Sequence, residues 1–216
     1  MERIGTDESG KGDYFGPLVV AAVHVNAASE KYLAEIGVKD CKKLSDSRAL
    51  ELAEAIKKIS PHDVVRINPQ KYNHLQAKFG NLNVLLAWAH ARAIENLLGK
   101  VECKKVISDQ FGDEKYLKEK LMKKGKKVEL IQMHRAESDI AVAAASVLAR
   151  AAFLDSIAYL SRSYGIKFPK GASEVEHAGR MFLAAYGPER LGEVAKVHFK
   201  TTGKLGITAA VEEKDS

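Results

Sequence analysis

The chain has 216 residues, of which 46% are hydrophobic and 29% are charged, and its formal net charge is +6. This length predicts one domain over residues 1–216 with a substantial core, and the positive charge favours a polyanionic partner. The sequence has no apolar run long enough to span a membrane and no signal peptide, and its two cysteines, Cys41 and Cys103, are too few for a disulfide framework. We therefore expect a cytoplasmic protein with no membrane partner, acting as a monomer.

The apolar pattern predicts an α/β fold, with a mixed central sheet flanked by helices. The predicted strands are residues 3–6, 17–25, 63–67, 104–108 and 127–132, the first two joined through a glycine-rich turn. Helical spacing of apolar residues predicts helices at 47–59, 82–98, 113–124 and 138–160. Two more helices, at 173–186 and 188–196, are predicted within a C-terminal helical region at about 165–205.

Residues 7–18, Asp-Glu-Ser-Gly-Lys-Gly-Asp-Tyr-Phe-Gly-Pro-Leu, are the most informative segment. Two carboxylates, Asp7 and Glu8, come at the end of a predicted strand, and Lys11 follows between two glycines. Carboxylate oxygens suit Mg²⁺ and Mn²⁺, glycines allow a backbone to approach a ligand closely, and lysine offers a point charge to a phosphate. The glycine spacing matches neither a dinucleotide fingerprint nor a Walker motif. The segment therefore predicts a metal-dependent enzyme that acts on phosphodiesters.

Two further acidic residues, Asp109 and Glu137, lie at the ends of predicted elements, where side chains converge over a sheet edge. Carboxylates gathered there repel one another unless cations neutralise them, and two cations about 4 Å apart can promote phosphodiester hydrolysis. Neighbouring residues of a regular strand point to opposite faces, so we expect a bend or strand end near Ser9 and Gly10 to bring Asp7 and Glu8 together. Taken alone, Asp109 or Glu137 fits a cap or turn residue better than a catalytic one.

Other charged residues have simpler interpretations. The lysines at 115–127 fit a solvated helix face as well as a nucleic-acid contact. Asp13 is expected to form a turn, and Asp139 is expected to be exposed or to cap a helix.

The motifs resemble the type 2/type 3 ribonuclease H family, and type 3 in particular. The resemblance extends over nearly the whole chain, in segments 5–18, 38–46, 109–111, 135–137, 141–150, 168–173 and 195–200. Type 2 members are similar to Asp-Glu-Ala-Gly-Arg-Gly in the first segment and typically have Asp as the fourth carboxylate, so Ser9, Lys11 and Glu137 favour type 3. The sequence departs from the family at Cys41, where Ser is usual. Type 3 members also usually carry an additional N-terminal substrate-binding domain, whereas Asp7 lies almost at the start here.

The resemblance implies a ribonuclease H-like fold and endonucleolytic cleavage of the RNA strand of RNA–DNA hybrids, giving 5′-phosphate and 3′-hydroxyl ends. It implies that Mg²⁺ or Mn²⁺ is required and that the catalytic and metal-binding set is Asp7, Glu8, Asp109 and Glu137. The backbone of Gly10, Lys11 and Gly12 is then expected to contact the ribose 2′-hydroxyl. The expected substrate contacts are Ser9, Gly10, Lys11, Gly12, Lys42, Lys43 and Lys170, with Lys196 and Lys200 as further phosphate contacts.

Two alternatives remain open at this stage. The first is type 2 activity, which incises duplex DNA at single embedded ribonucleotides. The second is a hybrid-binding protein with weak catalysis, which clustered carboxylates disfavour because negative charge near phosphates opposes binding.

Overall fold

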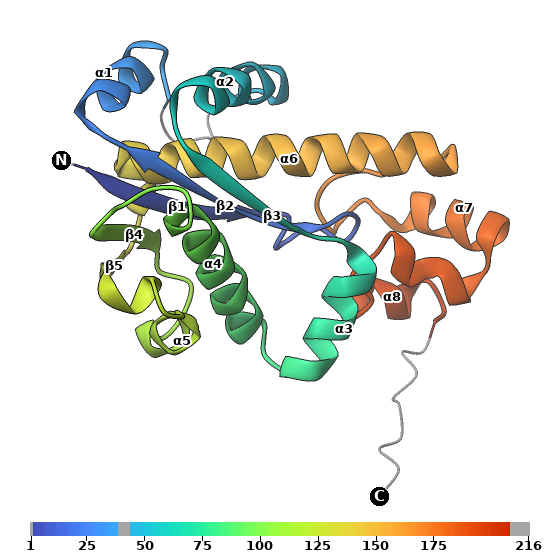
Figure 1. The fold of residues 1–216 in the computed structure, drawn as a ribbon. Helices are drawn as coiled ribbons and strands as arrows, with labels where there is room; N and C mark the ends of the chain where they lie inside the picture. Colours follow the sequence, from blue (N-terminus) through green and yellow to red (C-terminus); the bar gives the residue numbers. More distant parts are fainter. Residues whose placement is uncertain (1, 39–43, 208–216) are drawn as a thin grey trace, which may run out of the picture.

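The computed structural model describes residues 2–38 and 44–207. Five strands form one sheet in the order β3–β2–β1–β4–β5 (Figure 1): β1 (Arg3–Ser9), β2 (Leu18–Val25), β3 (His62–Ile67), β4 (Lys105–Asp109) and β5 (Glu129–Met133). β2 is antiparallel to β1 and to β3, whereas β4 is parallel to β1 and to β5. The predicted mixed sheet is therefore confirmed. Because β1 and β4 are parallel neighbours, their C-terminal ends lie at the same edge of the sheet.

Helices cover both faces of this sheet (Figure 1). On one face, α6 (Ile140–Tyr164) packs against β1 and β2, with α1 (Ala27–Glu35) and α2 (Asp46–Ile59) beside it. On the other face, α4 (Leu82–Leu98) packs against β2 and β3, with α3 (Pro69–Phe79) and α5 (Glu114–Lys120) beside it. The helices α7 (Glu176–Tyr186) and α8 (Lys200–Lys204) lie near the C-terminal end of α6.

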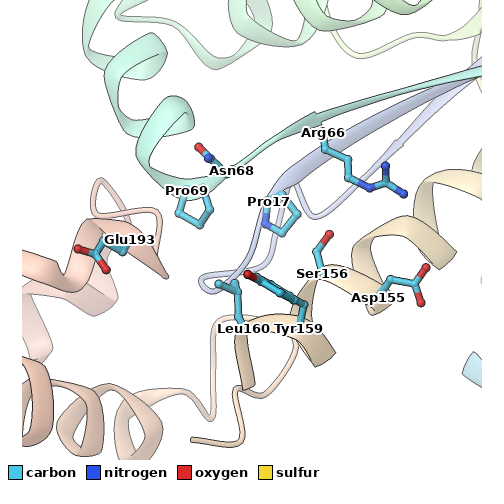
Figure 2. A pocket seen from close by; sticks show the side chains of 9 residues that line it. All are labelled: Pro17, Arg66, Asn68, Pro69, Asp155, Ser156, Tyr159, Leu160 and Glu193. Carbon is cyan, nitrogen blue, oxygen red and sulfur yellow. The ribbon is translucent and has the colours of Figure 1, made fainter. Parts of the chain in front are cut away.

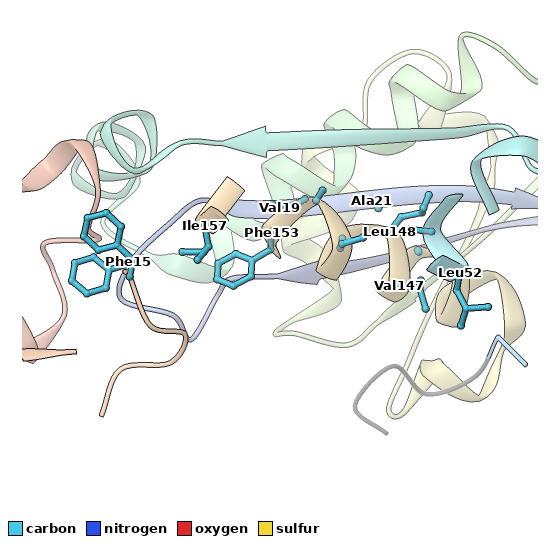
Figure 3. Close-up of a cluster of buried hydrophobic side chains, with 14 of the residues drawn as sticks. Phe15, Val19, Ala21, Leu52, Val147, Leu148, Phe153 and Ile157 are labelled. Atoms are coloured by element: carbon cyan, nitrogen blue, oxygen red, sulfur yellow. The ribbon is translucent and has the colours of Figure 1, made fainter. Parts of the chain in front are cut away.

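The small residues at the start of α6 let its backbone touch the sheet. A Cβ added at Gly5 of β1 would lie 2.1 Å from the carbonyl carbon of Ala141, so only glycine fits there. Further along α6, larger side chains such as Leu148 and Phe153 fill the space above β2 (Figure 3). Helix α6 is also long and apolar enough to cross a membrane, which differs from our expectation, but 72% of its most apolar window is buried inside the protein.

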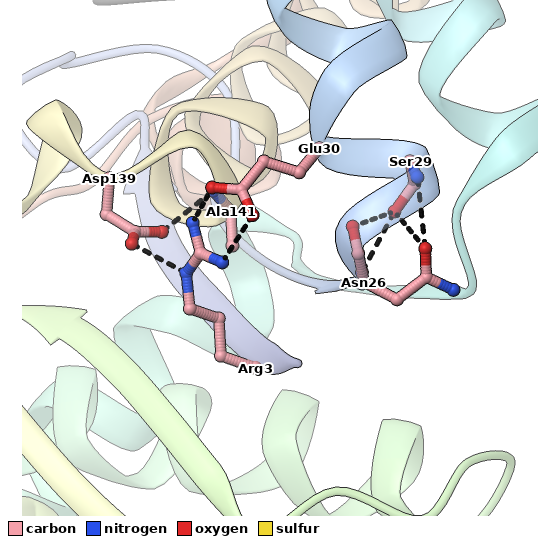
Figure 4. A network of polar contacts seen from close by, with 6 residues as sticks. All are labelled: Arg3, Asn26, Ser29, Glu30, Asp139 and Ala141. Atoms are coloured by element: carbon pink, nitrogen blue, oxygen red, sulfur yellow. Dashed lines mark hydrogen bonds and ion pairs between the residues drawn. The ribbon is translucent and has the colours of Figure 1, made fainter. Parts of the chain in front are cut away.

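A polar network fixes the beginning of α6 (Figure 4). Asp139 accepts the N–H of Ala141 at 2.8 Å, so it caps the helix as predicted. Its other oxygen accepts Arg3 Nε at 2.6 Å, and the same guanidinium donates to Glu30 of α1 at 2.8 and 3.1 Å. The guanidinium of Arg3 therefore joins β1, α1 and α6 where all three begin.

Two predicted helices differ from the structure. Helix α5 ends at Lys120 instead of continuing to residue 124, because the Glu95 carboxylate accepts the N–H groups of Met122, Lys124 and Gly125. The predicted helix at 188–196 is wrong: residues 188–193 form a 3₁₀ helix and Ala195 then forms an isolated β-bridge with Phe15. The short helices α1, α3 and α8 were not predicted.

Candidate functional site

Strand β1 continues to Ser9, beyond the predicted residues 3–6, and Asp7 and Glu8 both lie within its regular pairing with β2. Their carboxyl groups consequently reach different helices. Glu8 contacts His90 of α4, and Asp7 accepts a hydrogen bond from Ser146 of α6. The strand end therefore does not turn both side chains to one face, and any shared ion has to lie at the edge where β1 finishes.

The Glu8 carboxylate is held by two positive or hydrogen-bonding groups. Its Oε2 lies 3.1 Å from Nε2 of His90, and its Oε1 lies 3.6 Å from Nζ of Lys11. The Nδ1 atom of His90 lies 2.9 Å from the Thr6 hydroxyl. Burial alone would raise the pKa of Glu8, but the hydrogen bond from His90 and the charges of His90 and Lys11 outweigh it, and the pKa is lowered. Glu8 is therefore ionised at neutral pH.

Asp7 has the opposite environment. Burial first, and then the charges of Glu8 and Asp109, raise the pKa of Asp7 to about 7, against the hydrogen bonds from Ser146 and from the N–H of Glu8 at 2.8 Å. The charges of Glu8 and Asp109 therefore act on the Asp7 carboxyl group. A cation at this edge would relieve that repulsion.

The third and fourth acidic residues come from the β4 edge. Asp109 is the last residue of β4, and its Oδ1 accepts the N–H of Ala136 at 3.2 Å. Glu137 follows in the short 3₁₀ helix Ala136–Ser138, which begins after Arg135 at a φ of 56°. The bond from Ala136 thus brings the Glu137 segment next to the strand end that carries Asp109.

In the part of the chain that the structure describes, no group of three or more His, Cys, Asp or Glu side chains converges closely enough to hold a metal ion as the side chains stand. The donor set nevertheless fits a hard divalent cation, because it consists of carboxylate oxygens and the charges of Glu8 and Asp109 already act on Asp7. Asp7, Glu8 and Asp109 are the residues that would hold it, with Glu137 beside them.

The glycine-rich loop continues directly from Ser9. Gly10 has a φ of 85°, and a Cβ there would lie 2.1 Å from the Pro17 carbonyl oxygen and 2.9 Å from the Phe153 ring. Gly12 is exposed, and a Cβ there would meet nothing within 4 Å. Gly10 is thus required by the fold, whereas the structure leaves space for a side chain at Gly12.

The predicted phosphate contact by Lys196 is wrong, because the side chain of Lys196 is completely buried. Its Nζ donates to the carbonyl oxygens of Asp13 at 2.7 Å and Gly16 at 2.8 Å, and lies over the ring of Tyr72. Its backbone N–H donates to the Tyr14 carbonyl at 2.8 Å. Lys196 therefore holds the backbone of residues 13–16 in place through hydrogen bonds. Burial lowers the pKa of Lys196 to about 7.

The other proposed substrate contacts have varied surroundings. Lys170 is half exposed and pairs with Asp46 at the start of α2, while Lys200 is exposed at the start of α8. Asp13 accepts the N–H of Gly171 at 2.6 Å, which adds a cross-link to its expected role in a turn. Lys42, Lys43 and Cys41 lie outside the described residues.

A pocket of about 550 Å³ lies elsewhere, between the loop before α3 and the C-terminal half of α6 (Figure 2). It is lined by residues that include Pro17, Arg66, Asp155, Tyr159 and Glu193. None of the four predicted metal ligands lines this pocket, so it is not the site formed by the carboxylates.

The sequence analysis missed several residues that complete the site. Ser146 is the only polar residue between Ala141 and Ala149, a signal that could have suggested its contact with Asp7. His90 lies in an apolar helix and gave no comparable signal, although it contacts Thr6 and Glu8 and stacks on Phe111. These residues come from α4 and α6, one helix on each face of the sheet.

The fold and these motifs have close counterparts among known proteins. The family described as Ribonuclease HII matches residues 4–202. A protein named Ribonuclease HIII from Protochlamydia amoebophila is 49% identical over 209 residues, which are 94% of this chain and 69% of that protein.

Among solved structures, Bst-RNase HIII in complex with Mn²⁺ is 35% identical with a TM-score of 0.89, and the match covers 95% of this chain and 69% of that one. The ribonuclease H2 from Pyrococcus horikoshii has a TM-score of 0.81 at 24% identity over 95% of this chain and 97% of its own, which shows the shared fold alone. The predicted ribonuclease H-like fold is confirmed. The chain therefore belongs to the ribonuclease HII family, and its relatives place it among the type 3 ribonuclease H enzymes.

Proposed function

We propose that this chain is an endoribonuclease that cleaves the RNA strand of RNA–DNA hybrids by two-metal-ion hydrolysis and leaves 5′-phosphate and 3′-hydroxyl ends. The observation that carries the proposal is the placement of Asp7, Glu8 and Asp109 at the C-terminal ends of the parallel neighbours β1 and β4, where burial first, and then the charges of Glu8 and Asp109, raise the pKa of Asp7 to about 7. Divalent cations that bind there stabilise the protein, because they neutralise the repulsion between the carboxylates. The similar Bst-RNase HIII structure is a complex with Mn²⁺, which supports the use of a divalent cation by this chain.

In this proposal, Asp7, Glu8, Asp109 and Glu137 hold Mg²⁺ or Mn²⁺. When bound, the cations supply an activated water and stabilise the charge that develops on the leaving oxygen. The protein side chains contribute position: Ser146 orients Asp7, and the N–H of Ala136 orients Asp109. These hydrogen bonds keep the carboxylates from turning away from the edge.

The glycine-rich loop is proposed to select RNA. Gly10, Lys11 and Gly12 follow β1 directly, so their backbone lies beside the carboxylates that flank the scissile phosphate. A backbone without a side chain at Gly12, which is exposed, can approach a ribose 2′-hydroxyl, the group that distinguishes RNA from DNA. Lys11 and Ser9 are proposed to contact the adjacent phosphate, with Lys42, Lys43, Lys170 and Lys200 as outer contacts that hold the duplex.

We further propose that residues 1–216 act as one catalytic domain in the cytoplasm, as a monomer. The type 2 alternative, incision at single ribonucleotides, uses the same carboxylates and differs in what the loop accepts. A weakly catalytic hybrid-binding protein is disfavoured by the buried negative charge at the site, which opposes phosphate binding without cations.

A gel assay tests the proposal. A uniform RNA–DNA hybrid and a DNA duplex with a single ribonucleotide are incubated with the protein in Mg²⁺, Mn²⁺ or EDTA. We expect cleavage of the uniform hybrid with either cation and none in EDTA. The variant Asp155→Asn, which changes an exposed carboxylate on α6, is the matched control and should cleave normally. Cleavage in EDTA would contradict the metal requirement, and preference for the single ribonucleotide would favour the type 2 alternative.

A further inference from the structure

His90 is a completely buried histidine in the middle of α4. Its ring contacts both chain segments that carry the proposed ligands at the ends of β1 and β4. Nε2 lies 3.1 Å from Oε2 of Glu8, and Nδ1 lies 2.9 Å from the hydroxyl of Thr6, both residues of β1. The face of the ring stacks on Phe111, two residues beyond Asp109, with 4.8 Å between centroids and 27° between planes. With both nitrogens and one face engaged, the ring has a single orientation.

The chemistry of Glu8 determines the direction of its hydrogen bond with His90. An ionised carboxylate only accepts, so Nε2 of His90 donates to Glu8. The Nδ1 atom shares the second hydrogen bond with the Thr6 hydroxyl, which can donate or accept. Thr6 and Glu8 are two residues apart on β1 and therefore lie on the same face of the sheet. The hydroxyl of Thr6 thus holds the ring in the orientation that presents Nε2 to Glu8.

The two oxygens of Glu8 have contacts of different strength. Oε1 lies 3.6 Å from the ammonium of Lys11, a half-exposed and flexible side chain. Oε2 meets the rigid ring of His90. The ring is consequently the contact that determines where the Glu8 carboxylate lies, and its stacking on Phe111 joins that position to the segment after Asp109.

We infer that His90 is a positioning residue for divalent-cation binding, which holds the Glu8 carboxylate and the Asp109–Phe111 segment at a fixed separation. The inference rests on the proposed function, because that function gives Glu8 its role as a ligand. Replacing a group that orients a metal ligand typically lowers metal affinity or activity by about 10- to 100-fold.

Three variants test the inference. His90→Phe keeps a ring that stacks on Phe111 but removes both hydrogen bonds. Thr6→Val removes only the hydroxyl that holds Nδ1 of His90. His24→Phe is the matched control, because His24 is also buried and its Nε2 lies 2.7 Å from a glutamate, Glu2, at the other end of the sheet. For each variant, thermal unfolding, Mn²⁺ affinity by titration calorimetry, and kcat and KM on a uniform hybrid are measured.

We expect His90→Phe to lower Mn²⁺ affinity by about 10- to 100-fold and to lower kcat, with KM for the hybrid changed less than about twofold. Thr6→Val should show a smaller loss in the same direction, and His24→Phe should bind Mn²⁺ as the unchanged protein does. A folded His90→Phe variant with unchanged Mn²⁺ affinity and kcat would overturn the inference. If His90→Phe does not fold, unchanged Mn²⁺ affinity in Thr6→Val overturns it.

The variant Glu8→Gln separates this inference from the proposed function. If Glu8→Gln binds Mn²⁺ as tightly as the unchanged protein, Glu8 is not a ligand and both proposals fail. If Glu8→Gln loses Mn²⁺ while His90→Phe and Thr6→Val retain it, only the role of His90 is removed.

Discussion

Two buried charged groups lie at the two ends of the glycine-rich segment, and they are balanced in opposite ways. At its start, burial first, and then the charges of Glu8 and Asp109, raise the pKa of Asp7 to about 7. At its end, the ammonium of Lys196 donates to two carbonyl oxygens at 2.7 and 2.8 Å and lies over an aromatic ring. The first is a set of like charges, and the second is one amine that is hydrogen-bonded to two carbonyl oxygens and lies near the opposite charge of Asp13.

A strongly shifted pKa has a different meaning in these two environments. The pKa values of Asp7 and Lys196 are both strongly shifted, and burial is the largest cause of each shift. At the carboxylate end the second cause is a like charge, which a bound cation would remove. At the Lys196 end the hydrogen bonds are already made within the protein. A shifted pKa therefore indicates a binding site where like charges accompany it, and a structural anchor where the donors are already satisfied.

The largest expected effect comes from removing charge at the carboxylate end. Asp7→Asn and Asp109→Asn should each lower kcat on a uniform hybrid by about 10³-fold or more, because a metal ion supplies several kcal/mol of transition-state stabilisation. The fold should remain, as measured by circular dichroism. Near-normal turnover at saturating Mn²⁺ in either variant would remove that residue from the ligand set.

The carboxylate end should also make stability depend on pH in the metal-free protein. The raised pKa of Asp7 means that the folded state binds a proton between about pH 4 and 7 that the unfolded state has released. Stability should therefore fall as pH rises through this window, by up to about 1.4 kcal/mol per pH unit. Denaturant unfolding in EDTA at several pH values measures the free energy of unfolding. In Asp7→Asn the dependence of this free energy on pH should be weaker. An equal slope in the variant would contradict the assignment.

The Lys196 end should show the opposite sign in a higher window. Its lowered pKa means that, between about pH 7 and 10, the unfolded state binds a proton that the folded state lacks. The contribution of Lys196 to stability should therefore rise as pH increases from 7. Lys196→Met should remove this rise, whereas Lys200→Met, which changes an exposed lysine, should preserve it. Adding Mn²⁺ should not alter this pH dependence of stability. That result would distinguish the effect of Lys196 from the effect of Asp7.

Between the two ends, Gly10→Ala and Gly12→Ala should behave differently. Alanine at Gly10 meets a carbonyl oxygen and requires a positive φ, so stability should fall by about 1–3 kcal/mol. Gly12→Ala should fold normally, so any loss of hybrid cleavage in that variant reports contact with substrate. Normal cleavage by Gly12→Ala would show that the 2′-hydroxyl is not contacted at Gly12.

The smallest effect is expected from Lys11→Ala. Loss of one phosphate contact should raise KM modestly and reduce the log–log salt slope by about 0.9 or less. Lys11 also lies 3.6 Å from Glu8, and its positive charge competes with a cation for that carboxylate. Removing this charge should therefore not lower the affinity for Mn²⁺. An unchanged salt slope would show that Lys11 serves the carboxylate instead of the phosphate.

The sequence predicted those parts of the site that depend on local pattern. Asp7 and Asp109 could be placed because apolar runs locate the strands that deliver them. The early end of α5 could not be predicted, because Glu95 satisfies the backbone of a segment about 30 residues away.

Lys196 and His90 show the same limit at the site itself. A lysine in the sequence looks the same whether it is exposed or buried, and Lys196 is buried only because its partners lie 180 and 183 residues earlier. Similarly, the contact between His90 and Glu8 spans 82 residues. Such contacts follow from the packing of the sheet and helices and leave no periodic signal in the sequence.

The bridge between Phe15 and Ala195, with the Lys196 bonds beside it, has a consequence for biosynthesis. A ribosome makes residues 13–16 long before residues 194–196, so the loop beside the carboxylates cannot take its final shape until the later segment has emerged. A nascent chain contains Asp7, Glu8 and Asp109 about 85 residues before it contains residues 194–196. Cutting activity would thus be withheld until residues 194–196 have emerged from the ribosome.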